Sequence, residues 1–176
     1  NYNVFMEDQK PLSFEKYLQY DEKAAAISGN ASGFVYRMLE YSLKDELVSR
    51  LGKDAQIDIS EAGQRSGNIC PEHAASGSAV ESVYQRTAGK TADQDGVLRI
   101  ESVDEETGVL ILTVSEDADC SGLPVLGETV CNYDEGFLSG ILSVYTGKPY
   151  SAIEIDCWAT GDRVCRFRAE IVKSEG

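Results

Sequence analysis

Cysteine number and placement set the narrowest limits on the structure of this chain. The sequence has five cysteines, and four of them, Cys120, Cys131, Cys157 and Cys165, lie in its second half. An odd number of cysteines argues against a disulfide framework, and Asn1–Asn3 do not open the basic-then-apolar profile of a secretory signal. The cysteines therefore favour metal binding or thiol chemistry, and we expect a cytoplasmic protein.

Length and charge narrow the classes of function. A chain of 176 residues with 42% hydrophobic side chains can bury one sizeable core. We therefore predict one domain over 1–176, helical over about 1–95 and α+β over about 96–176. The chain carries 30 acidic against 16 basic residues, which opposes binding to nucleic acid or to an anionic membrane. No apolar run approaches the ~20 residues that a membrane-spanning helix needs.

The first half of the chain is predicted to be mainly helical. Apolar residues recur at helical spacing over 33–51, and Gly52 is placed to end that helix. Segments near 13–28, 55–66 and 74–88 have a similar pattern whose ends are blurred by glycines. The apolar stripe expected on the helix 33–51 consists of Val35, Met38, Leu39, Leu43, Leu47, Val48 and Leu51.

From Gly96 onward the pattern becomes that of strands. Two apolar, β-branched runs at 97–100 and 109–114 flank Asp104–Gly108, which has the composition of a turn. This arrangement predicts a β-hairpin.

One helix is expected to separate this hairpin from a second. Helical spacing returns over 133–145 and stops before Gly147 and Pro149. Alternating segments at 150–157 and 164–172 then predict the second hairpin. Helices followed by strands with one inserted helix indicate an α+β fold with a mainly antiparallel sheet.

Three of the late cysteines are expected to meet at one end of this sheet. Cys157 ends one strand of the second hairpin and Cys165 begins the other, while Cys131 precedes the helix 133–145, whose N-terminus favours a thiolate. Glu154 lies three residues before Cys157, so a bulge or a bent strand end is needed to turn both side chains to one face. Such groups suit zinc, and four protein ligands would make the site structural. The alternative is that the cysteines are small buried hydrophobic residues.

Two segments carry a resemblance to a known family. Residues 130–140 (VCNYDEGFLSG) and 154–167 (EIDCWATGDRVCRF) resemble the 4-vinyl-reductase-like domain family, which includes the sensory domains of phenol- and toluene-responsive transcription activators. A looser likeness extends over 37–39, 51–55 and 61–67. The resemblance implies a ligand-trafficking-like fold, with N-terminal helices packed on the sheet.

The resemblance also implies which residues bind zinc. One position at a time, the ligands of the similar sensors fall on Cys131, Glu154, Cys157 and Cys165. Cys120 is the alternative to Glu154, because four thiolates would suit zinc better than three thiolates and a carboxylate. The other interpretation of Cys120 is a thiol in the core or the pocket wall.

A ligand pocket beside the zinc is a further implication of the resemblance. In the phenol sensors a His and a Trp anchor the ligand hydroxyl, whereas His73 and Trp158 are the only such residues here and 110–113 is Leu-Ile-Leu-Thr. A larger apolar or aromatic molecule is therefore favoured over phenol. Its expected contacts are Phe34, Met38, Leu110, Leu112, Tyr133, Phe137 and Ile141, which could equally be plain core.

Three classes of function remain open at this point. The leading hypothesis is a zinc-stabilised sensor, homodimeric, that binds a small hydrophobic or aromatic molecule and signals to an attached or partner regulatory protein, as in transcription regulation. The second is a vinyl-group reductase or a tetrapyrrole-pathway accessory protein, although the sequence has neither a dinucleotide-binding turn nor a cluster-binding cysteine run and no catalytic residue is assigned. The third is a structural or trafficking adaptor.

Haem binding is a minor variant of the second hypothesis. Cys70-Pro71 and the nearby His73 are residue types that can ligate haem iron. The alternative is a half-buried cysteine and a histidine in a surface loop.

Overall fold

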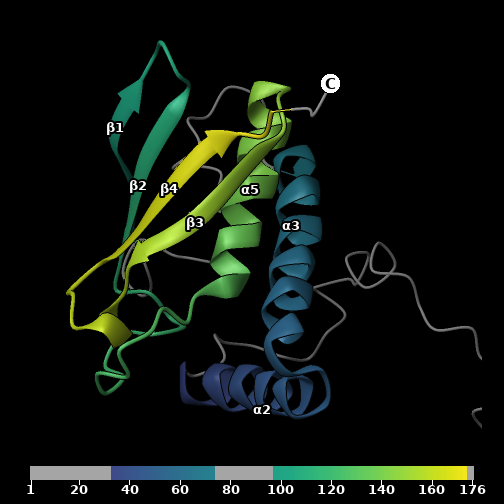
Figure 1. Ribbon diagram of the computed structural model, residues 1–176, viewed down its shortest axis with the longest axis vertical. Helices are drawn as coiled ribbons and strands as arrows, with labels where there is room; N and C mark the ends of the chain where they lie inside the picture. Colours follow the sequence, from purple (N-terminus) through teal and green to yellow (C-terminus); the bar gives the residue numbers. More distant parts are fainter. Residues whose placement is uncertain (1–32, 74–96, 174–176) are drawn as a thin grey trace, which may run out of the picture. The chain divides into compact units, whose positions relative to one another are not determined.

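The sheet forms where apolar side chains alternate with polar ones in the second half of the chain. The computed structural model describes residues 33–73 and 97–173, and within them four strands pair antiparallel in the order β1-β2-β4-β3 (Figure 1). Their bounds are β1 (Val97–Asp104), β2 (Val109–Ser115), β3 (Tyr150–Asp156) and β4 (Cys165–Ile171). Both expected hairpins, β1–β2 and β3–β4, are confirmed, and β4 lies between β2 and β3.

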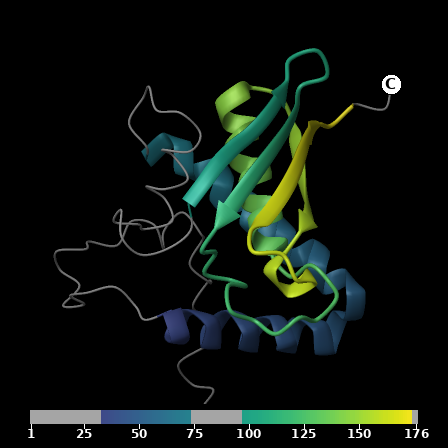
Figure 2. The same ribbon diagram turned by 90° about the vertical axis from the view of Figure 1, so that its left-hand side faces the viewer.

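Three α-helices occur in the same described ranges. They are α2 (Gly33–Leu51), α3 (Ala55–His73) and α5 (Asn132–Thr146), with short 3-10 turns at η1 (Gly52–Asp54) and η2 (Trp158–Thr160). α5 lies between the sheet and α3, and α2 runs crosswise at the N-terminal end of α3 (Figures 1 and 2). The α+β fold with one helix between its hairpins is therefore confirmed. Among the described helices, none has the length and apolar character needed to cross a membrane.

The helix boundaries agree with the sequence pattern where they can be compared. α2 spans the expected 33–51 and ends at Gly52, whose φ of +62° is a left-handed conformation that favours glycine. α3 continues to His73, beyond the expected end at residue 66. The expected helices at 13–28 and 74–88 lie outside the described residues.

The core lies between the inner face of the sheet and α5. Leu112, Val114 and Phe167 point inward from β2 and β4, and each is fully buried. Leu138 and Ile141 meet them from α5. Burying each such side chain contributes about 1.5–3 kcal/mol, so this layer holds the second half of the chain together.

Side chains of α5 also accept hydrogen bonds from backbone N–H groups along the free edge of β3. The carboxylate of Glu135 accepts the N–H of Glu154 at 2.9 Å, and the Ser139 hydroxyl oxygen accepts the N–H of Ala152 at 2.8 Å. Glu135 and Ser139 are four residues apart and lie on one face of α5, while Ala152 and Glu154 are two apart and face the same side of β3, so each acceptor meets one N–H group. These hydrogen bonds fix β3 against α5 and protect a sheet edge.

Glycines allow α3 and α5 to touch along their backbones. A Cβ atom on Gly63 would lie 2.1 Å from the carbonyl oxygen of Tyr133, and one on Gly136 would lie 1.7 Å from that of Ser60. Gly140 is equally crowded, with the Gln64 carbonyl oxygen 2.5 Å from its Cβ position. No larger residue fits at these positions without moving a helix.

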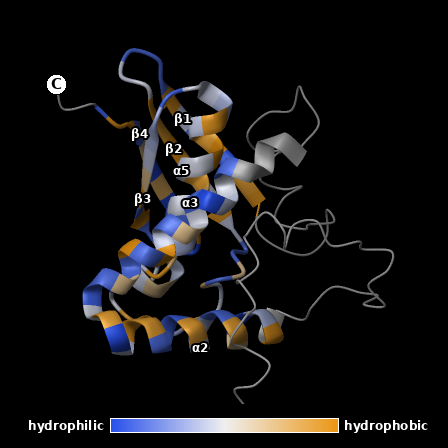
Figure 3. Cartoon of the chain, turned by 90° about the vertical axis from the view of Figure 1, so that its right-hand side faces the viewer, coloured by the Kyte–Doolittle hydropathy of each residue, from blue (hydrophilic) through white to orange (hydrophobic). Residues whose placement is uncertain are grey.

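The apolar stripe expected on α2 does not face the described core. Val35, Met38, Leu39 and Leu43 are 57–63% exposed. Tyr36, Arg37, Tyr41 and Lys44 of α2 contact the rest of the molecule through hydrogen bonds instead. The helix itself is confirmed, and these four exposed apolar residues are called the outward face of α2. Figure 3 colours the hydrophobic positions along α2 orange.

Candidate metal centre

Four cysteines from four different segments gather at one end of the sheet. Cys120 lies in the loop after β2, Cys131 immediately precedes α5, Cys157 follows β3, and Cys165 begins β4. All four are buried, and their sulfurs lie within 4.8 Å of one another. The pairing of Val114 with Cys165 explains the convergence, because it brings the end of β2 beside the start of β4.

The spacing of the sulfurs is compatible with a tetrahedral metal site. The Sγ atom of Cys131 lies 3.9 Å from that of Cys157 and 3.8 Å from that of Cys165. Zn–S bonds of about 2.3 Å give a tetrahedron with edges of about 3.8 Å. The Sγ atoms of Cys120 and Cys165 are closer, at 3.0 Å, and would have to separate slightly around an ion. The four cysteines could therefore bind a metal.

A bulge brings Glu154 to the same place. The β3–β4 register shifts between Glu154 and Asp156, so Glu154 and Cys157 both point inward despite their odd spacing. The expectation that a bulge or a bent strand end is required here is confirmed.

Glu154 is buried beside the sulfurs without being fully hydrogen-bonded. It is 5% exposed, and its Oε2 atom accepts the N–H of Cys131 at 3.0 Å. Its Oε1 atom has no hydrogen-bond partner among the described residues. Burial raises the pKa of this carboxyl to about 8, with the Cys157 sulfur adding to the effect. The group can therefore act as a metal ligand or as a proton donor to a thiolate.

Four thiols this close cannot all ionise without a cation. Hydrogen bonding to Cys120 raises the pKa of the Cys131 thiol and also that of Cys165. The hydrogen bond with Cys120 lowers the pKa of Cys157, and the N–H of Ala159 adds to that effect. One thiolate is thus favoured at Cys157, and a bound metal has to displace the other protons.

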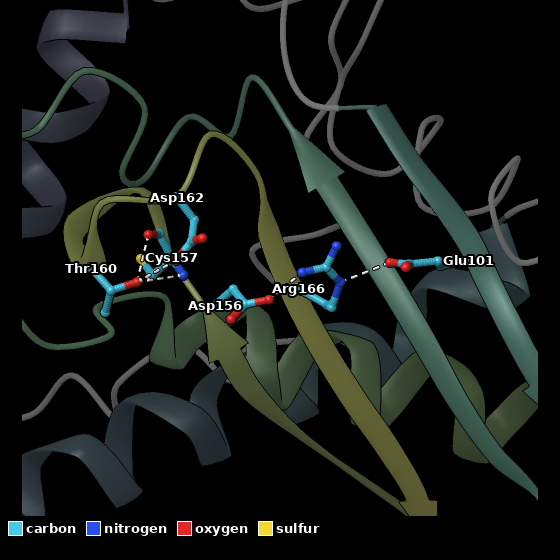
Figure 4. Close-up of polar contacts among 6 residues, drawn as sticks. All are labelled: Glu101, Asp156, Cys157, Thr160, Asp162 and Arg166. Atoms are coloured by element: carbon cyan, nitrogen blue, oxygen red, sulfur yellow. Dashed lines mark hydrogen bonds and ion pairs between the residues drawn. The ribbon is translucent and has the colours of Figure 1, made fainter.

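The turn after Cys157 is held by hydrogen bonds to Thr160. The Thr160 hydroxyl accepts the N–H of Cys157 at 3.0 Å and lies 2.7 Å from its carbonyl oxygen (Figure 4). Arg166 faces the opposite side of the sheet, where its guanidinium pairs with Asp156 and, at 2.8 Å, with Glu101. The polar network around Arg166 therefore supports the strands and leaves the inner face to the sulfurs.

The loop that carries Cys120 is fastened to η2. The indole N–H of Trp158 donates to the carbonyl oxygen of Leu123 at 3.1 Å, and the N–H groups of Leu126 and Gly127 donate to that of Ala159. These contacts place the loop beside Cys157. Trp158 thus positions a cysteine-bearing loop.

α2 binds both cysteine-bearing loops through cationic side chains. Arg37 donates to the carbonyl oxygens of Ala118 and Ser121, which flank Cys120. Lys44 donates to the carbonyl oxygen of Val130, next to Cys131. These hydrogen bonds connect α2 to the backbone beside two of the four cysteines.

Comparison with known proteins identifies the part of the chain that contains this centre. Residues 110–171 match the V4R domain family. These 62 of the 176 residues resemble a V4R domain, and the term V4R domain is used for them alone. The resemblance inferred from 130–140 and 154–167 is thereby confirmed.

Relatives of the V4R domain are found in an archaeon. The uncharacterized proteins MJ1642 and MJ0150 of Methanocaldococcus jannaschii are 32% identical over 77 residues and 30% identical over 76 residues. These matches cover 44% and 43% of this chain, and 47% and 43% of the relatives. The chain thus spans about half the length of the curated relatives it matches.

Solved structures share the fold at low sequence identity. The phenol-responsive sensory domain of the transcription activator PoxR with phenol is 20% identical, with a TM-score of 0.58 over 76% of this chain and 73% of that one. A vinyl-4-reductase family protein from Methanocaldococcus jannaschii is 14% identical, with a TM-score of 0.53 over 83% and 85% of the two chains. A trafficking protein particle complex subunit 3 from Naegleria fowleri, covalently bound to palmitic acid, is 12% identical, with a TM-score of 0.58 over 80% and 95%.

The residues expected to line a ligand pocket are distributed over the core and α2. Leu112, Phe137 and Ile141 are buried in the core of the V4R domain, and Leu110 and Tyr133 pack against it. Met38 is 58% exposed on α2, and the side chain of Phe34 lies outside the described part of the chain. The pocket stays a prediction.

The segment considered for haem lies at the end of α3. Cys70, Pro71 and His73 belong to the last turn of this helix, so the backbone at His73 is helical and not a loop. Their side chains are outside the described part of the chain.

Sequence reasoning missed the acidic side chains around the cysteines. Asp117 and Asp119 are each 4% exposed, and Asp134 is 8% exposed. The sequence signal for the first two is the alternation Asp-Ala-Asp-Cys at 117–120, which places two carboxylates immediately before a cysteine. No motif indicated that this loop would be covered by α2.

Proposed function

We propose that this chain is a sensory domain in which a zinc ion bound by thiolates stabilises the V4R domain. The gathering of four buried cysteine sulfurs within 4.8 Å of one another carries this proposal. Zinc suits a tetrahedral thiolate site and brings no redox chemistry of its own. Four protein ligands would leave no position for a substrate, so the ion would be structural.

The proposed ligands are Cys120, Cys131, Cys157 and Cys165, with Glu154 as the alternative to Cys120. The Glu154 carboxylate already accepts the N–H of Cys131 at 3.0 Å. With its pKa raised to about 8, its other oxygen can keep a proton at neutral pH and donate it to a thiolate. Such a hydrogen bond would offset part of the excess negative charge that four thiolates bring to a dication.

The molecule sensed would be small and hydrophobic or aromatic. The V4R match supports this class, as does a fold shared with a phenol-responsive sensory domain and with a subunit bound to palmitic acid. Tyr133 is the best placed of the proposed contacts, because its ring stacks on Phe137 at a centroid distance of 6.3 Å and borders the core. An aromatic pair of this kind suits an apolar guest with one polar group.

α2 is the element proposed to pass the signal on. Arg37 and Lys44 connect it to the backbone on either side of the centre, so a shift of these loops would reach α2. Its outward apolar face would dock a second copy of the chain, and an attached or partner regulatory protein would respond to the change. A role in transcription regulation is one form that this response could take.

Ligand-dependent melting of the zinc-loaded chain tests this function. A panel of alkylphenols and medium-chain fatty acids is added and the melting temperature is followed by calorimetry. A ligand present at 100 times its Kd should add about 2.7 kcal/mol to the free energy of unfolding, and Tyr133→Ala should weaken binding at least about tenfold. Tyr145→Ala, an exposed tyrosine on the same helix, is the matched control and should bind like the wild type.

The outcomes separate the competing functions. A zinc-loaded chain that no member of the panel stabilises would contradict the sensor and favour a structural or trafficking adaptor. Visible absorbance from a co-purified tetrapyrrole would favour the vinyl-reductase pathway instead.

A further inference from the structure

A second group of potential metal ligands adjoins the four cysteines. A carboxylate oxygen of Asp117, the Sγ atom of Cys131 and a carboxylate oxygen of Asp134 lie within 4.8 Å of one another. All three residues are buried. Asp117 belongs to the loop after β2 and Asp134 to the first turn of α5, so the group joins two segments that the cysteines also join.

Asp117 is buried with one of its two carboxylate oxygens unpaired among the described residues. It is 4% exposed, and its Oδ1 atom accepts the N–H of Asp119 at 2.8 Å. Its Oδ2 atom is buried and has no hydrogen-bond partner among the described residues. An ionised carboxylate left in this state costs several kcal/mol, unless an ion or a proton compensates it.

The basic side chains nearby do not neutralise this carboxylate. Arg37 and Lys44 are directed at backbone carbonyl oxygens, and neither forms an ion pair with Asp117 in the described part of the chain. Asp119 and Glu40 are further acidic groups beside Asp117, and the charges of Asp119 and Asp117 contribute to the raised pKa of Glu40. Within 33–73 and 97–173, no basic side chain forms an ion pair with Asp117.

We propose that Asp117, Asp134 and Cys131 bind a second divalent transition-metal ion, with the Cys131 sulfur bridging it to the ion of the four-cysteine site. This inference rests on the proposed function only in that both ions share Cys131. Mixed thiolate and carboxylate ligands suit Zn²⁺ or Co²⁺, whereas Ca²⁺ and Mg²⁺ take oxygen ligands almost alone. Three protein ligands leave a position for water, in contrast to the closed site beside it.

Metal titration followed by native mass spectrometry tests the second site. The full chain is freed of metal, refolded with Zn²⁺ and then with Co²⁺, and the bound ions are counted. Wild type should bind two ions and Asp117→Asn one, with the circular dichroism of the variant unchanged because the substitution keeps the shape of the side chain. Glu116→Gln, at the exposed residue next in the chain, is the matched control and should bind two.

A second readout reports the shared sulfur directly. Two Co²⁺ ions bridged by one thiolate couple magnetically, so the electron paramagnetic resonance signal of the wild type should be weaker than that of two separate ions. Asp117→Asn should show the full signal of a single uncoupled ion.

Each outcome bears on one of the two sites. One ion in the wild type would overturn the second site and leave the four-cysteine site intact, whereas no bound ion would overturn both. Two ions in Asp117→Asn would overturn the assignment of Asp117 as a ligand.

Discussion

Glu40 is a partly buried acid of α2 whose ionisation opposes folding. Burial and the nearby charge of Asp119 raise its pKa to about 8, Asp117 adds to the rise, and Lys44 and Arg37 counteract it. In the unfolded chain a glutamate titrates near 4.5. The folded chain therefore keeps a proton on Glu40 over a pH range in which the unfolded chain has lost it.

This difference predicts a specific pH dependence of stability. Because the folded state binds the extra proton, the contribution of Glu40 to the free energy of unfolding falls as pH rises from about 4.5 to 8 and then levels off. Glu40→Gln should remove this decline, so it should be increasingly stabilising relative to wild type toward pH 8. Urea unfolding of both chains from pH 5 to 9, at constant zinc concentration, measures the difference.

Asp45→Asn provides the control, because Asp45 is exposed on the same helix. Its unfolding free energy should follow that of wild type across the range. Parallel curves for Glu40→Gln and wild type would show that Glu40 ionises normally in the folded chain.

At the level of single residues, the sequence indicated three of the four sulfurs. Cys131, Cys157 and Cys165 adjoin regular elements, so strand and helix periodicity was enough to bring them together. Cys120 lies in a loop, where the periodicity of a helix or strand cannot predict the direction of its side chain. The spacing of the residues could not decide whether Cys120 or Glu154 is the fourth ligand. Only the tertiary contacts of that loop with η2 and α2 place its sulfur in the group.

The contact between α3 and α5 depends on glycine at each crossing point. Gly140→Ala should destabilise the chain by about 3 kcal/mol, because the added methyl group would overlap the Gln64 carbonyl oxygen 2.5 Å away. The midpoint of urea unfolding measures the loss. Val144→Ala, at a half-exposed position of the same helix, should change stability by well under 1 kcal/mol.

If Gly140→Ala unfolded at the wild-type midpoint, α3 would have room to move away from α5 without cost. The backbone contact would then not stabilise the fold.

The elements themselves were largely predictable, but their packing partners were not. The period of apolar residues changes at Gly96, and turn residues bound each segment, so both hairpins, α2 and α5 could be placed from the sequence. The orientation of α2 could not, because a helical stripe of apolar residues indicates a buried face without indicating what covers it. On α2, Arg37 and Lys44 contact the described molecule, whereas Val35, Met38, Leu39 and Leu43 are exposed.

At the scale of the whole molecule, the outward face of α2 is the surface that we propose for the expected homodimer. Four large apolar side chains there are 57–63% exposed, which is typical of an interaction surface. Leu39→Glu should therefore convert a dimer to a monomer in light scattering coupled to gel filtration. Ser49→Glu, which adds the same charge at an exposed position of α2, should remain dimeric.

A monomeric wild type at micromolar concentration would remove the dimer from the proposed signalling route. A dimer that persists in Leu39→Glu would assign its interface to another surface.

X-ray absorption at the zinc edge of the chain loaded with one equivalent of zinc tests the metal centre most directly. Four sulfur neighbours at about 2.3 Å are the expected result, and three sulfurs with one oxygen at about 2.0–2.2 Å would assign the fourth position to Glu154. A shell of nitrogen and oxygen alone, or a chain that retains no zinc after dialysis, would contradict a thiolate-bound metal in this domain.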